Sequence, residues 1–285
     1  MAVGVFVGLS TIDLIHTVDA FPSPNSKSVA HRQELLVGGP ATNAAVTFSY
    51  LGGKAALVSV VGRNPLAAII KDDIERHSIE LIDLAPKQNE LPAISSVWVD
   101  RRGQRSVVSV NTSKLADSSA DVDRAVLEKA RIVEVDGHSM AACQAWAREA
   151  HSRGIPVVLD GGSWKKGTEE LLAFVDVAIC SADFRPPGCA DQDQVVGYLQ
   201  AHHVKHIAIS RGAEPIRFQS GCSTGSIAVP EVDVVDTAGA GDVLHGAFCF
   251  YASEGEDFSS ALRKAALVAS KSCRYPGTRR WMQAE

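Results

Sequence analysis

The sequence lacks paired cysteines, a positive net charge and a long hydrophobic run, and each absence excludes a class of protein. The six cysteines form no C-x-x-C pair and no cluster with histidine, so neither a disulfide scaffold nor a structural zinc site is expected, and a reducing compartment is favoured. The formal net charge of -5 argues against a general nucleic-acid binder. No run approaches the roughly 18 apolar residues of a membrane span, and the N-terminus lacks the basic segment of a signal peptide. We therefore expect a cytoplasmic protein with neither nucleic acid nor a membrane as a partner.

Short β-branched runs alternate with amphipathic segments of helical length along the chain. The runs are almost uniformly apolar, which is typical of strands buried on both faces of a sheet. We expect strands at VGVFVG (3–8), AALVSVVG (55–62), RIVEVD (131–136), IPVVLD (155–160), VDVAIC (175–180) and KHIAIS (205–210). We expect helices near 40–51, 64–77, 140–153, 191–202, 240–254 and 258–273. This alternation predicts an α/β fold with a doubly wound, mainly parallel sheet flanked by helices.

Two stretches, 13–37 and 92–111, do not fit this alternation. The first is extended in character and contains two prolines, whereas the second has two alternating runs around an Arg-Arg-Gly turn, a pattern that predicts a β-hairpin. We expect both to form a small β-sheet lid inserted into a single domain spanning 1–285, with Arg101, Arg102 and Arg105 facing solvent. Because a sheet this small is marginally stable alone, we expect a homodimer formed through the lid.

The stretch VDTAGAGDVLHGAF (235–248) combines an anion site with carboxylates. Gly239 and Gly241 allow close approach to a ligand, and the helix that follows directs free N–H groups and its positive dipole end outward. The glycine spacing matches neither of the common phosphate loops. A carboxylate at Asp242 would repel a phosphate, but it can accept a proton from an alcohol that attacks phosphorus. The stretch therefore favours phosphoryl transfer to a hydroxyl over simple phosphate binding.

The heptapeptide DTAGAGD resembles the D-T-x-G-A-G-D signature of the ribokinase-like (PfkB) carbohydrate kinases, and the resemblance extends along the whole chain. GGPATNAA (38–45) is similar to the N-terminal G-G-x-x-x-N signature of the family, and GLSTID (8–13) to its first strand ending in an aspartate. SRGAEP (210–215) looks like the T-x-G-x-x-G segment, with proline at the second glycine. The motifs look closest to the ketohexokinase and sulfofructose kinase branch.

The resemblance implies a role for each matching residue. Asp242 is the expected catalytic base, and the N–H groups of Gly239, Ala240 and Gly241 form the expected anion hole. The expected sugar-binding residues are Asp13, Gly38, Gly39 and Asn43. The expected ATP-binding residues are Ser210 and Gly212, with the segment 269–277, which contains Lys271, Arg274 and Gly277, lining the adenine pocket. Lys271 or Arg274 is a candidate phosphate ligand.

The expected cofactors are ATP and Mg²⁺, and the resemblance also suggests K⁺ near the DTAGAGD turn. The N-x-x-E motif that places metal-bound water in the family should follow the strand at 175–180, where this sequence has Ser-Ala-Asp-Phe. Asp183 or Asp160 could replace it. Asp236 either fixes the turn or helps to place a cation.

The expected substrate is a ketose or related sugar, phosphorylated on a primary hydroxyl group. Lys27 and Asn111 match positions that surround an anionic sulfonate in the sulfofructose branch, but His138 stands where that branch has arginine. Neutral histidine lacks the guanidinium fork, which weakens the case for a sulfosugar. Alternatives are a sulfofructose, sugar-phosphate or nucleoside kinase on the same scaffold, or a non-catalytic module that senses a sugar or nucleotide.

Overall fold

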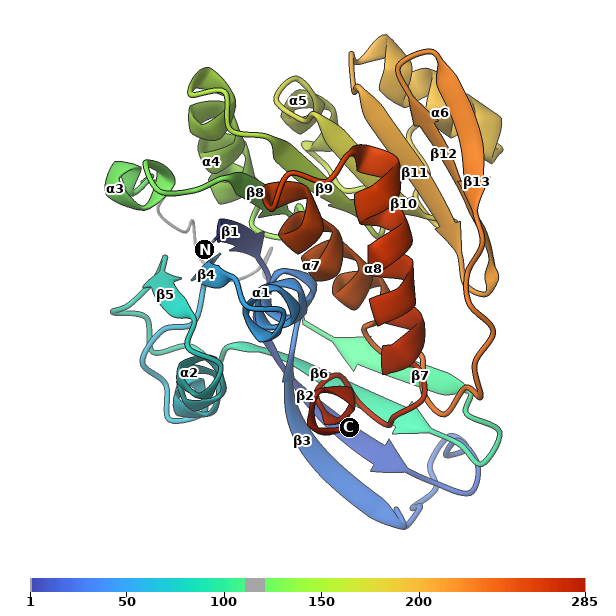
Figure 1. Ribbon diagram of the computed structural model, residues 1–285. Helices are drawn as coiled ribbons and strands as arrows, with labels where there is room; N and C mark the ends of the chain where they lie inside the picture. The colour runs from blue at the N-terminus through green and yellow to red at the C-terminus, as the bar shows by residue number, and fades with distance from the viewer. Residues whose placement is uncertain (1, 111–120, 285) are drawn as a thin grey trace.

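The computed structural model describes residues 2–110 and 121–284, and its largest element is a nine-stranded sheet (Figure 1). The strand order is β13-β12-β11-β10-β9-β8-β1-β4-β5. All neighbours from β11 to β5 are parallel, whereas β12 and β13 continue the sheet as antiparallel strands. The strands are β1 Val3–Gly8, β4 Lys54–Ser59, β5 Glu80–Asp83, β8 Ile132–Val135, β9 Val157–Gly161, β10 Val177–Ser181, β11 His206–Arg211, β12 Glu214–Ser220 and β13 Ser223–Ile227.

Helices cover both faces of this sheet and form a separate apolar core on each. One face carries α1 Pro40–Tyr50, α2 Ala67–Arg76, α7 Ala240–Ser253 and α8 Phe258–Ser272. The other carries α3 Arg124–Leu127, α4 Met140–Ser152, α5 Thr168–Leu172 and α6 Gln192–Ala201. A short 3₁₀ helix, η2, spans Arg280–Gln283. The predicted α/β architecture is confirmed. None of the helices in the described ranges is both long and apolar enough to cross a bilayer.

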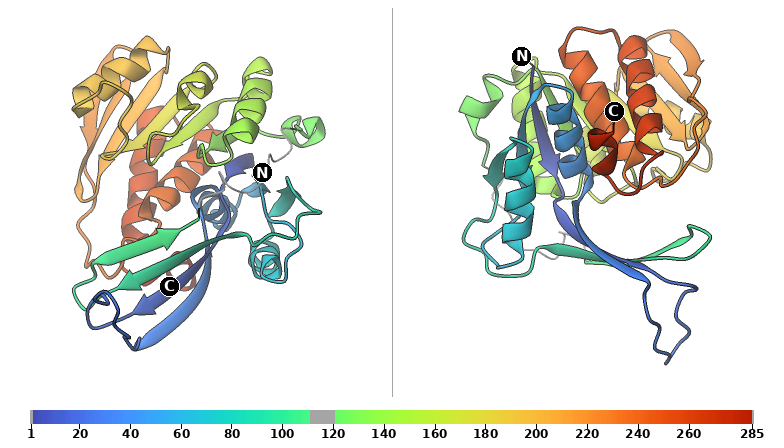
Figure 2. Two further views of the ribbon diagram at one scale, coloured as in Figure 1. Left: turned by 180° about the vertical axis from the view of Figure 1, so that it is seen from behind. Right: turned by 60° about the horizontal axis from the view of Figure 1, so that its bottom comes forward.

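A second, four-stranded sheet projects from the main body (Figure 2). Its order is β3-β2-β6-β7, with β2 and β6 parallel and both outer pairs antiparallel. The strands are β2 Thr11–Thr17, β3 Arg32–Gly38, β6 Ala93–Val99 and β7 Arg105–Ser109. The small separate sheet expected at 13–37 and 92–111 is thus present, and the hairpin around the Arg-Arg-Gly turn is β6–β7.

The first strand, β1, has the predicted bounds 3–8, but the position of Asp13 differs from the prediction. Asp13 was expected at the carboxyl end of the first strand, whereas it lies in β2, after the chain has crossed into the lid. Three strands, β5, β12 and β13, were not predicted. β5 and β13 are the two edge strands of the main sheet, and β12 lies next to β13. All three are exposed along part of their length, so they lack the continuous apolar run that identified the buried strands.

Candidate active site

The N-terminus of α7 is the centre of the candidate site. Gly239, the residue before the helix, has a left-handed backbone (φ 68°), a conformation that glycine adopts without strain. The first turn of a helix leaves N–H groups without helical partners, and Gly241 and Asp242 lie in that turn. The Ala240 N–H makes a long bond of 3.3 Å to Thr237 O. The loop thus presents donors beside a carboxylate, as the sequence indicated.

Asp242 is held by an asparagine from α1. Asn43 Nδ2 donates to Asp242 Oδ2 over 2.6 Å. Burial, followed by the nearby Asp160 carboxylate, raises the pKa of Asp242 to about 6, while the hydrogen bond from Asn43 acts in the opposite direction. A carboxylate with this pKa can accept a proton near neutral pH. The two motifs that contain Asn43 and Asp242 therefore meet at one point.

Two further acids lie in β8 or immediately after it, and the sequence analysis assigned a role to neither. Asp136 accepts hydrogen bonds from the backbone N–H groups of Leu9 (2.8 Å), Ala41 (3.2 Å) and His138 (2.9 Å). It therefore joins the ends of β1 and β8 to the start of α1. Glu134 is fully buried, and burial together with neighbouring carboxylates raises its pKa well above the ordinary value. The sequence feature that could have pointed to Asp136 is its position at the end of an apolar run.

The lid contributes Asp13 to the site. Its carboxylate interacts with the side chains of Thr11 and Ser95, and burial raises its pKa against these hydrogen bonds. A Cβ atom at Gly38 would overlap this carboxylate, so glycine is required there for close approach. Gly39 (φ 102°) then turns the chain into α1, which carries Asn43. The predicted sugar-site residues are therefore assembled at the junction between lid and main body.

A mainly apolar cavity of about 560 Å³ begins at the same loop. Ser210 and Gly212 line it, as expected, and so do Ala240 and Gly241. Most of the remaining lining residues come from the connection after β13 and from α8 and its C-terminal end, including Ala269, Ser270 and Cys273 of the expected adenine segment. The described Lys271 and Gly277 do not line the cavity. The Gly277 N–H donates instead to Asp236 Oδ2 over 2.8 Å.

The three acids considered for a metal differ in their contacts. Asp236 accepts hydrogen bonds from the N–H groups of Ala238 (2.9 Å) and Gly277 and also pairs with Arg105, so it fixes the turn. Asp160 lies 3.5 Å from His245 Nδ1. Asp183 is exposed at the end of β10. No cluster of three or more candidate metal ligands occurs in residues 2–110 and 121–284.

The residues considered for an anionic substrate receive little support. Lys27 is exposed in the connection between β2 and β3. Burial lowers the pKa of His138, so its imidazole is neutral near pH 7. Asn111 lies outside the described residues.

Two arginines that the sequence analysis did not place in the site reach it. Arg105, expected to face solvent, extends from β7 to the carboxylate of Asp236. Arg279, which follows α8, donates from Nη1 to Asn43 Oδ1 over 2.7 Å. No sequence signal pointed to either contact, since more than 130 residues separate the partners of each pair.

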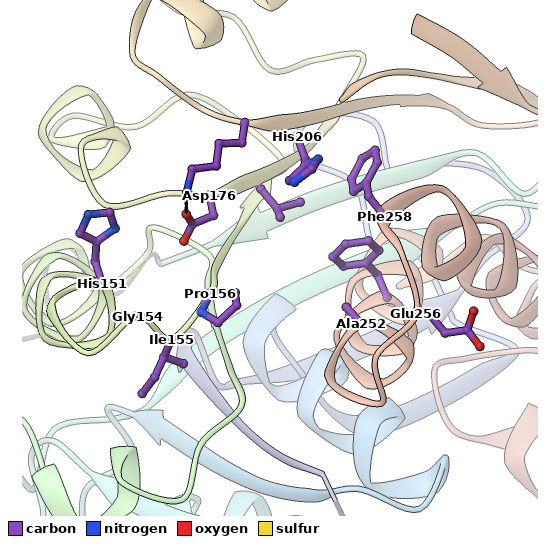
Figure 3. Close-up of a pocket in the computed structure, with 12 residues that line it drawn as sticks. His151, Gly154, Ile155, Pro156, Asp176, His206, Ala252, Glu256 and Phe258 are labelled. Atoms are coloured by element: carbon purple, nitrogen blue, oxygen red, sulfur yellow. Dashed lines mark hydrogen bonds and ion pairs between the residues drawn. The ribbon is translucent and has the colours of Figure 1, made fainter. Parts of the chain in front are cut away.

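Another hollow, shown in Figure 3, lies at the amino ends of β9, β10 and β11, away from the candidate site at the carboxyl ends of the strands. Its charged groups have partners within the protein: Lys205 pairs with Asp176 at 2.8 Å, and Glu256 pairs with Lys264. His206 Nδ1 lies 2.8 Å from Ser220 Oγ, and its ring stacks on Phe258. This hollow holds none of the predicted site residues.

The chain matches a protein family of known activity. The model of the pfkB family carbohydrate kinases matches residues 2–284. This chain belongs to the pfkB family of carbohydrate kinases. It is similar to the ketohexokinase of Mus musculus (23% identity, 95% of this chain and 96% of the relative). It is also similar to the ribokinase of Haemophilus influenzae (21% identity, 90% and 87%).

Solved structures of the pfkB family show the same fold. The structure of Arabidopsis thaliana ribokinase complexed with ribose and ATP superposes with a TM-score of 0.80 at 20% identity and covers all of both chains. Ribokinase from Thermotoga maritima gives a TM-score of 0.80 at 20% identity, covering 100% of this chain and 98% of the other. The protein is thus a ribokinase-like sugar kinase, a phosphotransferase with an alcohol group as acceptor, in a family that uses ATP.

Proposed function

We propose that this protein transfers the γ-phosphoryl group of ATP to a primary hydroxyl group of a ketose or closely related sugar. The observation that carries the proposal is the position of Asp242. Its carboxylate lies in the first turn of α7, between the apolar cavity and the lid residue Asp13, with a pKa of about 6. A sugar-sensing module would not need a base there, so an enzyme is favoured. The full chain, 1–285, would act as one catalytic domain.

In this proposal the two ligands meet at the N-terminus of α7. The adenine group occupies the 560 Å³ cavity beside Ser210 and Gly212, which directs the phosphates toward the loop. The sugar lies under the lid, where Asp13, Asn43 and the backbone at Gly38–Gly39 can bind its hydroxyl groups. Asp242 accepts the proton as the sugar oxygen attacks phosphorus, and ADP leaves. The N–H groups of Gly239 and Gly241 bind the charge that develops on the phosphoryl oxygens.

Mg²⁺ would enter with ATP, and Asp183 is the acid that we propose to hold it through water. The ion supplies charge neutralisation for the phosphates. A K⁺ requirement, which the family resemblance suggests, is tested by replacing KCl with choline chloride in the same assay.

A neutral ketose is favoured over an anionic sugar because the residues considered for binding an anion do not place a buried positive charge in the site. His138 is neutral near pH 7 because burial lowers its pKa, and Lys27 is exposed. The similarity to a ketohexokinase supports the same class. We also propose that two copies associate through their lids, which carry exposed apolar side chains.

The test is sugar-dependent ADP release over a panel of ketoses, aldoses, sugar phosphates and sulfosugars. Replacing Asp242 with asparagine should lower kcat by about 10²–10⁴-fold, the usual contribution of a general base, with ATP affinity unchanged. Asp193→Asn, an exposed acid in α6, is the matched control and should retain full turnover. Turnover by Asp242→Asn close to that of the unmodified protein would exclude Asp242 as the base.

A further inference from the structure

Arg279 belongs to none of the motifs that defined the site, yet its guanidinium group contacts three separate parts of the chain as well as the adjacent Thr278. The side chain is only 16% exposed. Nη1 donates to Asn43 Oδ1 over 2.7 Å and to Thr278 Oγ1 over 3.0 Å. Nη2 donates to Asp73 Oδ2 in α2 over 3.3 Å and to Val37 O over 3.4 Å. The arginine therefore links α1, α2 and the last residues of lid strand β3.

The contact with Asn43 determines how its amide group is oriented. An asparagine amide has a donor end and an acceptor end of nearly equal size. Arginine can only donate, so the oxygen of Asn43 must face Arg279, and its NH₂ group then faces Asp242. The ionised carboxylate of Asp242 can only accept, which agrees with this orientation. Hydrogen bonds thus connect Asp73, Arg279, Asn43 and Asp242 without a break: Arg279 donates to both Asp73 and Asn43, and Asn43 donates in turn to Asp242.

We propose that Arg279 is a positioning residue that fixes the Asn43 amide and, through it, the carboxylate of Asp242. Asp73 anchors the guanidinium at its other end, and Asp13 and Asp242 contribute to its electrostatic environment. The effect on catalysis rests on the proposed function, in which Asp242 is the base. The effect on the Asn43 amide does not depend on any activity.

The first test measures the Asn43 side-chain amide directly by NMR. Its NH₂ resonance is assigned as the one lost in Asn43→Ala. Replacing Arg279 with methionine, which preserves length but removes every donor, should speed hydrogen exchange at this amide by about tenfold. Arg280→Met is the matched control, because Arg280 is the next residue but pairs with Glu34 on the lid. Equal exchange in Arg279→Met and the unmodified protein would overturn the proposal.

The second test is a double-mutant cycle on kcat with a sugar that the panel identifies. Arg279→Met should lower kcat about tenfold while the KM for ATP changes less than twofold. In the Asn43→Ala background the same substitution should cost less than twofold, because Arg279 acts through Asn43. Equal losses in both backgrounds would show that Arg279 acts independently and would overturn the proposal.

A second variant tests the positioning role should Arg279→Met fail to fold. Asp73→Asn keeps the arginine but weakens its anchor. It should increase exchange at the Asn43 amide to a smaller extent, and unchanged exchange there would count against the positioning role. If no sugar supports ADP release but the Asn43 amide still depends on Arg279, the proposed function fails and the positioning role stands.

Discussion

Two aspartates of the site, Asp136 and Asp242, have the same side chain but differ in what remains available for a ligand. The oxygens of Asp136 accept hydrogen bonds from three backbone N–H groups, which hold the ends of β1 and β8 against α1. Asp242 receives a side-chain hydrogen bond from Asn43 on one oxygen. Asp136 therefore stabilises the packing of β1 and β8 against α1, whereas Asp242 can still accept a proton from a substrate.

The pKa of Asp242 predicts the pH dependence of the reaction. A base must be ionised to act, so kcat/KM for the sugar should fall as the pH drops below about 6. Asn43→Ala removes a hydrogen bond that lowers this pKa, so the acid limb should move to higher pH. The measurement is a kcat/KM profile between pH 5 and 8. Asn64→Ala, at an asparagine that bonds Asn89 O and the Leu66 N–H, should leave the limb unchanged.

Among single residues, the sequence predicted those that lie within motifs and missed those that contact a motif from a distant part of the chain. Asp242, Asn43 and Gly239 were predicted because their neighbours form recognisable patterns. Arg279 and Arg105 were not, because each reaches the site through a contact with a residue more than 130 positions away. A single sequence contains no information on such pairs, which depend on how α8 and β7 are placed in the fold.

At the scale of elements, the lid is connected to the catalytic loop by one ion pair. Arg105 lies in β7, on the same face of the lid as Asp13, because the register pairs Asp13 with Ser95 and Ser95 with Ser109, four residues after Arg105. Its guanidinium reaches Asp236, whose carboxylate also holds the N–H groups of Ala238 and Gly277. The pair thus joins the lid to the turn that precedes α7.

Removing this ion pair should affect binding more than chemistry. Arg105→Met should raise the KM for the sugar by about three- to tenfold with kcat changed less than twofold, because partly exposed pairs contribute about 1 kcal/mol. Arg101→Met is the control, since Arg101 in the same hairpin pairs with Asp19 within the lid. Steady-state kinetics of both variants decide the matter. Identical KM values for the two would contradict a connection between lid and loop.

The elements themselves were predicted in proportion to their burial. The inner strands and the six longer helices lie close to their predicted bounds, because buried strands are continuous apolar runs and amphipathic helices repeat with the helical period. The strands β5, β12 and β13, which lie at or next to the sheet edges, were not predicted because solvent covers part of their surface. The position of Asp13 was misjudged for another reason. The break between β1 and β2 falls at Leu9–Ser10, inside GLSTID (8–13), which was compared with a single strand that ends in an aspartate.

At the scale of the whole molecule, the face of the lid opposite Asp13 carries exposed apolar side chains. The register places Leu35, Leu14, Ser96 and Val108 in one row across the four strands, on the face opposite Asp13. Leu35 is 47% exposed and Val108 67%. Exposed apolar side chains gathered on one sheet face are typical of an interface, which supports the proposed lid-to-lid dimer.

Size-exclusion chromatography with light scattering tests the dimer. The unmodified protein should have the mass of two chains, and Val108→Asp should shift it to one, because a carboxylate on the row would be buried without a partner. Leu267→Asp, an exposed leucine in α8 (56%), is the control and should leave the dimer intact. A monomer before any substitution would rule the dimer out.

The buried carboxyl group of Glu134 separates the conditions that favour stability from those that favour turnover. Neither of its oxygens has a hydrogen-bond partner in the described part of the chain, and its pKa lies well above the ordinary 4.5. In the folded protein the group keeps its proton, whereas in the unfolded chain it ionises above pH 4.5. Unfolding then releases a proton, so the contribution of Glu134 to folding stability declines as the pH rises from 4.5 toward its folded pKa. In the proposed reaction, Asp242 must be ionised, and its pKa is about 6. Glu134 therefore favours mildly acidic buffer for storage, whereas Asp242 favours neutral buffer for the assay.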